Sequence, residues 1–203
     1  ALDRLRSLSV ERVIAVPVML FAAGHAKNDI PALLNAYSLE KGLQIDYGRE
    51  LGINNLMIGA AGSRVQEAID KLSGFPNSKI LLVVVGRGST DPDANSNVAK
   101  ITRMLVESFG LGWGETLYSG VTFPLVDPGL RHLVRLGFKR IIVFPYFLFS
   151  GVLVSRIRQQ TKAVADDFPE IEFINASYLG NHPLVRNNLK DRIEEVLQGV
   201  NAM

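Results

Sequence analysis

The chain has 203 residues, 47% of them hydrophobic, with no cysteine and a formal net charge of +2. This size and apolar content allow one large or two small domains with a buried core, and the small net charge gives no reason to expect a nucleic-acid partner. The lack of cysteine excludes disulfides, thiolate metal sites and iron–sulfur clusters and agrees with a cytoplasmic protein, while the apolar run over 141–154 is too short to cross a membrane.

The first part of the chain alternates apolar strands with amphipathic helices. The predicted elements are, in order, a helix over 1–8, a strand over 12–18, a loop that holds His25, a helix over 30–40, a strand over 43–47, a loop over 48–52 and a helix over 55–72. Pro31 fits the first turn of the second helix, and Asn28 or Asp29 is expected to cap it.

The same alternation starts again after a linker over 74–78. The pattern predicts a strand over 80–85, a helix over 95–109 behind a cap region at 91–93, a strand over 116–123, a helix over 128–136 and, further on, a helix over 157–168. Strands that alternate with helices in this way indicate an α/β fold built on parallel sheets with flanking helices.

The chain also repeats itself. When Ala1 is placed on Gly129, a shift of 128 residues (129 − 1), the two parts share one strand–helix plan. The matched pairs include Leu2 with Leu130, Leu5 with Leu133, Arg12 with Arg140, Pro17 with Pro145, and Leu51-Gly52 with Leu179-Gly180. The repeat predicts two similar lobes, over 1–74 and 79–203.

The first of these lobes is expected to be incomplete. Residues 79–128 precede the aligned part of the second repeat, and the first repeat has no counterpart to them. They contain a predicted strand, a helix and another strand. We therefore expect the chain to be an N-terminally truncated fragment of a two-lobed protein. The pattern predicts no oligomeric state.

His25 lies where a predicted strand ends and a helix begins, at the sheet edge where ligand sites of α/β proteins gather. Gly24 gives the loop beside it backbone freedom. A neutral imidazole is a good ligand for divalent first-row metals and takes up a proton near physiological pH. From position alone, His25 is either a metal ligand or a loop histidine that bonds to backbone.

Three segments, in the same order along the chain, carry a family resemblance. They are Pro17 with Phe21, Gly24-His25 and Asp29-Ile30-Pro31; VGRGSTDPDAN over 85–95; and FPYFLFSG over 144–151. In these segments the chain resembles the sirohydrochlorin cobaltochelatase (CbiX-type) family of class II tetrapyrrole chelatases. The resemblance implies a chelatase-like α/β fold of two facing lobes. It also implies that Co²⁺ is inserted into sirohydrochlorin in cobalamin biosynthesis, without an organic cofactor or ATP.

The resemblance also implies roles for particular residues. His25 would hold the metal and accept a pyrrole proton. The macrocycle pocket would be lined by Leu20, Phe21, Ala22, Ala23 and Gly24. Arg49, Lys27 and Arg87 are candidate counterions for the carboxylates of the tetrapyrrole, the alternative for each being a solvated surface charge. Glu50 is a candidate for assisting metal delivery or proton removal.

The second repeat offers no equivalent metal site. Leu153 stands at the position of His25, and Arg87 stands where the family has its first-strand histidine. The chelation site is therefore expected in the first lobe alone. The turn over 86–90 either holds a substrate anion or is a tight strand-to-helix turn. His132 and His182 are interpreted as surface or helix-capping residues.

Two alternatives stay open. The first is the same reaction with Fe²⁺, as in sirohaem synthesis, or with Ni²⁺, because one imidazole binds all three metals. The second is a tetrapyrrole-binding or carrier protein without catalytic activity. In either case the expected partners are a small tetrapyrrole and a divalent metal, with no nucleic acid and no membrane.

Overall fold

The computed structural model describes residues 1–72 and 74–199, which form two compact units. Unit 1 consists of Ala1–Gly52 and the chain from Arg186 onward, and unit 2 consists of Ile53–Val185. No helix in the described part of the chain is both long and apolar enough to span a membrane.

The compact units divide the chain at other places than the repeat does. Helix α3 (Asn55–Ile69) belongs to the first repeat but packs in unit 2. Helix α7 (Pro183–Leu197) belongs to the second repeat, but most of it packs in unit 1. The lobes over 1–74 and 79–203 therefore remain a prediction from the repeat. Residues 73 and 200–203 of those lobes lie outside the described residues.

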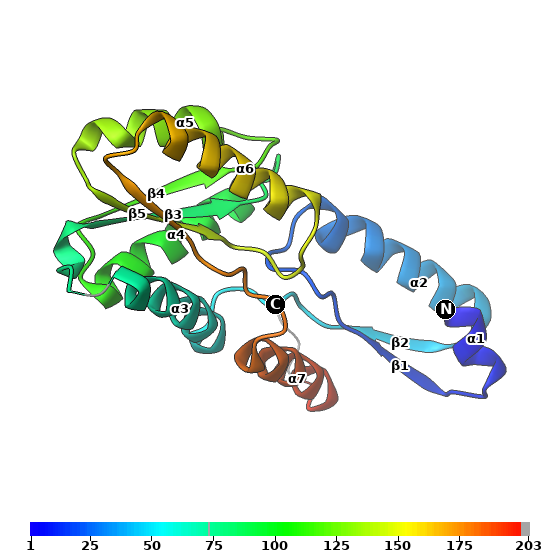
Figure 1. The fold of residues 1–203 in the computed structure, drawn as a ribbon. Coiled ribbons are helices and arrows are strands. Elements are labelled where there is room, and N and C mark those ends of the chain that lie inside the picture. Colours follow the sequence, from blue (N-terminus) through cyan, green and yellow to red (C-terminus); the bar gives the residue numbers. More distant parts are fainter. Residues whose placement is uncertain (73, 200–203) are drawn as a thin grey trace. The chain divides into compact units, whose positions relative to one another are not determined.

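Unit 2 is built on a four-stranded parallel sheet in the order β4-β3-β5-β6 (Figure 1). The strands are β3 (Ile80–Gly86), β4 (Trp113–Tyr118), β5 (Arg140–Pro145) and β6 (Glu172–Asn175). Every residue of β3 is buried, as expected of a charge-free apolar run that forms a central strand covered on both faces.

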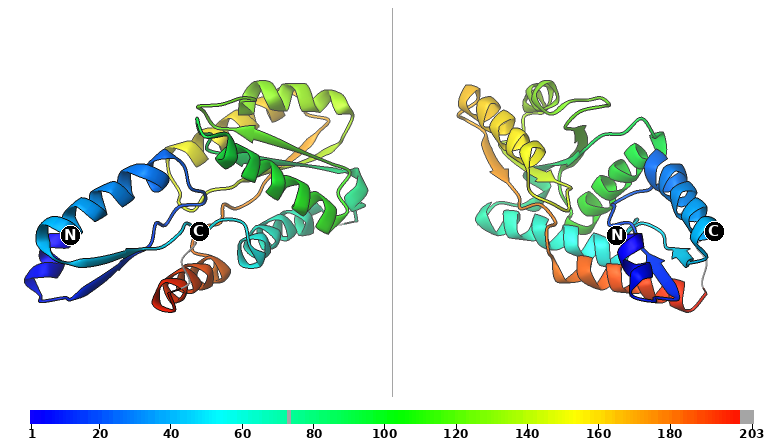
Figure 2. Two further views of the ribbon diagram at one scale, coloured as in Figure 1. Left: turned by 180° about the vertical axis from the view of Figure 1, so that it is seen from behind. Right: turned by 90° about the vertical axis from the view of Figure 1, so that its right-hand side faces the viewer.

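Helices cover both faces of this sheet. Helix α4 (Pro92–Phe109) packs on β3 and β4, and α3 packs on α4 and β5 on the same side (Figure 2). On the other side, α5 (Val126–Leu133) contacts β4, and α6 (Val152–Asp167) contacts β5 and β6. Short helical turns lie at Asp70–Leu72, Asn77–Lys79 and Val134–Leu136. Unit 2 is thus a doubly wound α/β domain.

Unit 1 has a smaller sheet. Strand β1 (Arg12–Ala15) pairs in parallel with β2 (Gln44–Tyr47), and α2 (Ile30–Lys41) packs on β2. The short helix α1 (Leu2–Ser7) is joined to α2 by a hydrogen bond from the Tyr37 hydroxyl to Asp3, at 2.5 Å. The carboxyl ends of the two strands lead into the loops that carry the predicted site residues.

The predicted repeat is present in the hydrogen bonding. Arg12 pairs with Gln44 across β1 and β2, and the residues 128 positions later (140 − 12), Arg140 and Glu172, pair across β5 and β6. The amide of Leu51 donates to Met19, and that of Leu179 donates to Phe147. Helices α3 and α7 also begin and end at equivalent positions. The two repeats therefore share register as well as element order.

A strand is present near the predicted 116–123, but the predicted bounds were wrong. The strand in the structure is β4, which starts at Trp113 because Trp113 and Gly114 pair with β3, and ends at Tyr118. After it, the Ser119 amide donates to the carbonyl of Gly86 and the chain turns, with the Thr122 amide donating to Gly120. Residues 119–125 form a loop at the carboxyl edge of the sheet.

Other boundaries also differ from the prediction. Strand β1 ends at Ala15 and not at residue 18. The chain turns after it, where the amide of Met19 donates to the carbonyl of Pro17. Helix α4 begins at Pro92, because the Asp91 carboxylate accepts hydrogen bonds from the next free amides, which confirms the cap region at 91–93. Helix α6 begins at Val152 and not at residue 157.

Candidate functional site

His25 opens a π-helical turn, His25–Asp29, that continues directly into α2. The amide of Ile30 donates to the carbonyl of His25. This bond joins residues five positions apart, instead of the four of an α-helix, and so defines a π-turn. Asp29 lies inside the helical geometry and makes no capping bond, so the prediction that Asn28 or Asp29 caps α2 was wrong. Such π-turns are rare and occur frequently at functional sites.

The carboxylate of Asp29 instead contacts the imidazole of His25. The distance from His25 Nδ1 to Asp29 Oδ2 is 2.6 Å, and the side chains are 85% and 62% exposed. The four-residue spacing places the two groups on one side of the helical turn. A carboxylate at Nδ1 fixes the proton on that nitrogen and leaves the lone pair of Nε2 for a metal, the usual arrangement behind a metal-binding histidine.

The contact between Asp29 and His25 was not predicted from the sequence. The four-residue spacing between His25 and Asp29 could have indicated this contact. It was overlooked because Asp29 was expected to cap the helix. Among the described residues, no group of three or more histidines, aspartates or glutamates lies close enough to hold a metal. His25 and Asp29 are therefore a pair and not a complete coordination shell.

The predicted apolar wall lies directly before this turn. Leu20, Phe21, Ala22 and Ala23 are half-buried, and Gly24 is exposed next to His25. The carbonyls of Met19 and Leu20 accept hydrogen bonds from the amides of Leu51 and Gly52, each at 2.9 Å. The loops after β1 and β2 are thereby joined at the carboxyl edge of the small sheet, as expected for a ligand site.

Arg49, the predicted counterion, is bonded to another residue of unit 1. Its guanidinium donates twice to the carboxylate of Glu195 in α7, at 2.9 and 2.7 Å. This ion pair, together with Arg192, lowers the pKa of Glu195. A substrate carboxylate would have to compete with Glu195 for Arg49. Lys27 lies exposed within the turn of His25.

The CbiX family model matches residues 1–68 and 81–196 of the chain. The chain belongs to the CbiX family. It is 38% identical to "Sirohydrochlorin cobaltochelatase" of Priestia megaterium, over 98% of this chain and 65% of the relative. It thus spans a little under two thirds of that relative's length. It is 30% identical to "Sirohydrochlorin ferrochelatase" of the same organism, over 92% of this chain and 68% of the relative.

A solved chelatase also shares the fold of this CbiX chain. The structure described as "SirB from Bacillus subtilis with Fe3+" superposes with a TM-score of 0.78 at 26% sequence identity, over 96% of this chain and 75% of that chain. The chelatase-like α/β fold inferred from the sequence is therefore confirmed.

The second repeat of this CbiX protein has apolar residues where the first has its polar pair. Leu153 and the buried Ile157 occupy the positions equivalent to His25 and Asp29. In the turn over 86–90, the Ser89 amide donates to Asn95, and the Ser89 hydroxyl accepts a bond from the amide of Asp91. These contacts favour the tight strand-to-helix turn over the anion-holding one, and they leave Arg87 exposed.

Proposed function

We propose that this CbiX protein inserts Co²⁺ into sirohydrochlorin, as a cytoplasmic enzyme of cobalamin biosynthesis. The observation that carries the proposal is the 38% identity, over 98% of the chain, to a protein described as a sirohydrochlorin cobaltochelatase. The ferrochelatase from the same organism is more distant, at 30% identity. Sirohydrochlorin and the divalent metal are both substrates in this reaction, and no organic cofactor takes part.

The pair of His25 and Asp29 suits this chemistry. Insertion needs a group that holds the metal while it loses water, and a base that accepts the two pyrrole N–H protons. We infer that Nε2 of His25 is the metal ligand and that Asp29, at 2.6 Å from Nδ1, keeps the ring in the tautomer and orientation that binding requires. As the metal passes from Nε2 to the tetrapyrrole nitrogens, the freed Nε2 accepts one of the two pyrrole protons, and the other goes to bulk water.

The neighbouring loop would receive the macrocycle. Half-buried apolar side chains at Leu20 and Phe21 offer a wall for a flat ring system, and the exposed Gly24 leaves room beside His25. Arg49 and Lys27 remain candidate counterions for the substrate's carboxylates, with Glu195 as the competing partner of Arg49.

Ferrochelatase activity is the second candidate, because the chain also matches three proteins described as sirohydrochlorin ferrochelatases, at 28% to 30% identity. Rates of metal insertion decide between the metals. The full-length protein would be mixed with sirohydrochlorin and Co²⁺, Fe²⁺ or Ni²⁺, and the change in tetrapyrrole absorbance followed against a protein-free blank.

We expect the fastest insertion with Co²⁺. Faster insertion of Fe²⁺ would assign the protein to sirohaem synthesis and overturn the cobalt assignment. Binding of sirohydrochlorin with no acceleration for any of the three metals would favour the carrier alternative and overturn the enzymatic proposal.

A further inference from the structure

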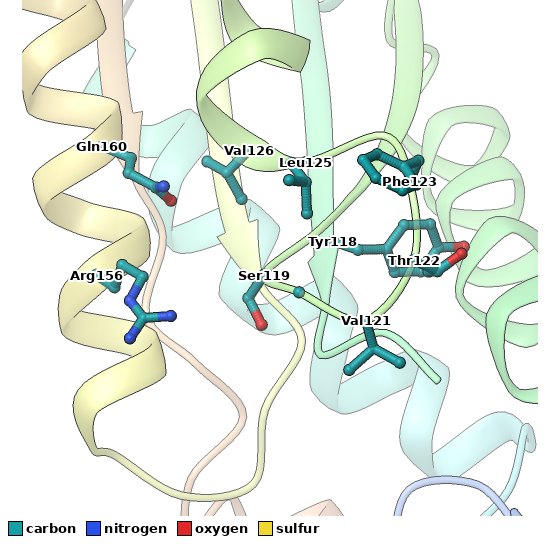
Figure 3. A pocket seen from close by; sticks show the side chains of 10 residues that line it. Tyr118, Ser119, Val121, Thr122, Phe123, Leu125, Val126, Arg156 and Gln160 are labelled. Carbon is teal, nitrogen blue, oxygen red and sulfur yellow. The ribbon is translucent and has the colours of Figure 1, made fainter. Parts of the chain in front are cut away.

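A cavity of about 330 Å³ lies at the carboxyl edge of the sheet in unit 2, and none of its lining residues has been assigned a role so far. The loop after β4 and the first residues of α5 form one side of it, and α6 forms the other (Figure 3). This edge of a doubly wound sheet is where ligands bind in such folds. The cavity is therefore placed where the architecture favours a ligand.

The loop that borders the cavity is held in a strained shape. Val121 has a φ of +67°, and the Thr122 amide donates to the Gly120 carbonyl at 2.7 Å, which makes a tight γ-turn. A β-branched residue with positive φ is a true outlier. The backbone of Gly88 packs directly against this turn: a Cβ added at Gly88 would lie 1.9 Å from the Gly120 carbonyl oxygen. Backbone strain that the surroundings hold in place is typical of ligand clamps.

The residues that line the cavity combine side chains that suit an anion with apolar side chains. Arg156 and Gln160 extend from α6 toward the loop, as Figure 3 shows. No aspartate or glutamate is among the described residues that line the cavity. Within the described residues Arg156 also forms no ion pair or hydrogen bond, whereas many other arginines of the chain do. The guanidinium is thus available to a ligand.

Two further features complete the site. The positive end of α5 begins at the cavity, and its N-cap residue, Leu125, supplies no side-chain cap. The side chains of Val121, Leu125 and Val126 give the cavity an apolar part. The Ser119 hydroxyl already donates to the Arg87 carbonyl at 3.1 Å, so the side-chain donors left in the described lining are Arg156, Gln160 and the Thr122 hydroxyl.

We propose that this cavity binds a carboxylate side chain of the tetrapyrrole substrate, with Arg156 and Gln160 donating to the carboxylate and the Leu125–Val126 side holding its methylene stem. The choice of a tetrapyrrole rests on the proposed function, since sirohydrochlorin carries many carboxylates. The choice of a carboxylate rests on the lining alone, because a guanidinium and an amide match its two oxygens.

The test is metal-free binding of sirohydrochlorin, followed by its absorbance, to the full-length protein and to three variants. Arg156→Gln removes the charge, and Arg156→Lys keeps the charge but loses the planar fork. Arg158→Gln is the matched control, an exposed arginine on the same helix outside the cavity. Succinate is titrated as a competitor to separate a free dicarboxylate from a tetrapyrrole side chain. Thermal melts verify folding.

We expect Arg156→Gln to weaken sirohydrochlorin binding by about tenfold or more, Arg156→Lys by less, and Arg158→Gln not at all. Unchanged affinity in Arg156→Gln, or equal losses in the two Gln variants, would overturn the proposal. So would an Arg156-dependent site that takes succinate without affecting sirohydrochlorin.

The same samples, assayed with Co²⁺, separate this proposal from the proposed function. An Arg156-dependent binding loss in a protein that never inserts metal would support the subsite and refute the chelatase. Normal insertion with no effect of Arg156 would refute the subsite alone. No binding of sirohydrochlorin by the wild-type protein would refute both.

Discussion

The imidazole of His25 is oriented by one side chain. Asp29 Oδ2 lies 2.6 Å from Nδ1, on an exposed turn where other described groups do not complete a metal shell. The contribution of this single contact is therefore large in the proposed reaction, because an unoriented ring would bind the metal through either nitrogen. Loss of a carboxylate behind a metal-binding histidine typically weakens metal affinity or activity by about 10- to 100-fold.

We accordingly expect Asp29→Asn to lower metal insertion by about 10- to 100-fold while the fold and sirohydrochlorin binding persist. Asp166→Asn is the matched control, because Asp166 is an exposed acid in a four-residue pair with Lys162 on α6. The measurement is the initial rate of Co²⁺ insertion for both variants. Equal rates for Asp29→Asn and the wild type would show that Asp29 plays no part.

The prediction that His182 caps a helix is confirmed. Its Nδ1 accepts a hydrogen bond from the Leu184 amide at 3.2 Å, just as Asn54, 128 positions earlier (182 − 54), accepts from Leu56. Burial and the charge of Arg64 lower the pKa of His182 from 6.5. The unfolded chain then binds this proton at a higher pH than the folded chain does, so stability is lost as the pH falls below about 6.5.

The substitution His182→Asn should keep the cap and remove this pH dependence. We expect the free energy of unfolding of the wild type to fall more steeply than that of His182→Asn between about pH 6.5 and pH 5, with similar values above about pH 7. Urea unfolding across this range measures the difference. Parallel pH profiles for the two proteins would contradict the argument.

At the scale of elements, the repeat reappears as two matching arginine contacts. Arg192 of α7 donates to the carbonyls of Glu50 and Leu51, at 2.9 and 3.1 Å, within unit 1. Arg64 of α3 donates to the carbonyl of Leu179 at 3.2 Å within unit 2. Positions 64 and 192, like 51 and 179, are equivalent under the repeat. In each unit, the last helix of one repeat is thus fastened to the Leu-Gly loop of the other.

Arg192 should matter more for stability than Arg64. Its side chain is 5% exposed against 21% for Arg64, and it bonds to two backbone carbonyls. We expect Arg192→Met to lower the free energy of unfolding by about 3 kcal/mol and Arg64→Met by about 1 kcal/mol. Urea unfolding provides the values, with the exposed Arg103→Met as control. Equal losses at positions 64 and 192 would contradict this ranking.

The order of the elements was predictable where the hydrophobic pattern was strong. The run over 80–85 could only be a buried strand, and the shared Arg, Pro and Leu-Gly positions disclosed the repeat. Residues 119–123 were misread as strand because Val121 and Phe123 have high strand propensity, yet both side chains are exposed in a loop. The π-turn at His25 was also missed, because a loop was expected there and the helix was expected to begin at residue 30.

The candidate site was predictable only where its residues are neighbours in the sequence. His25 and the loop over 20–24 stand next to one another in the sequence, so the strand-end rule was enough to find them. The bond between Arg49 and Glu195 joins residues far apart in the chain, and the cavity beside Arg156 joins α6 to the loop after β4. Such contacts depend on tertiary packing and leave no periodic signal.

At the scale of the whole molecule, one plan is used twice with different outcomes. Both repeats keep the same strand register and the same loop hydrogen bonds, but only the first has a histidine and an acid at the helix start. The second repeat has Leu153 and Ile157 there and an arginine-lined cavity nearby. On this account, metal chemistry belongs to the first repeat, and the second repeat contributes a subsite for one substrate carboxylate.

The most direct test of this account compares His25→Ala with His132→Ala, an exposed histidine of α5. Both full-length variants would be assayed for Co²⁺ insertion into sirohydrochlorin and, without metal, for binding of the tetrapyrrole. We predict that His25→Ala abolishes insertion and retains binding, and that His132→Ala behaves as the wild type. Insertion by His25→Ala at the wild-type rate would contradict the central claim that His25 carries the metal chemistry.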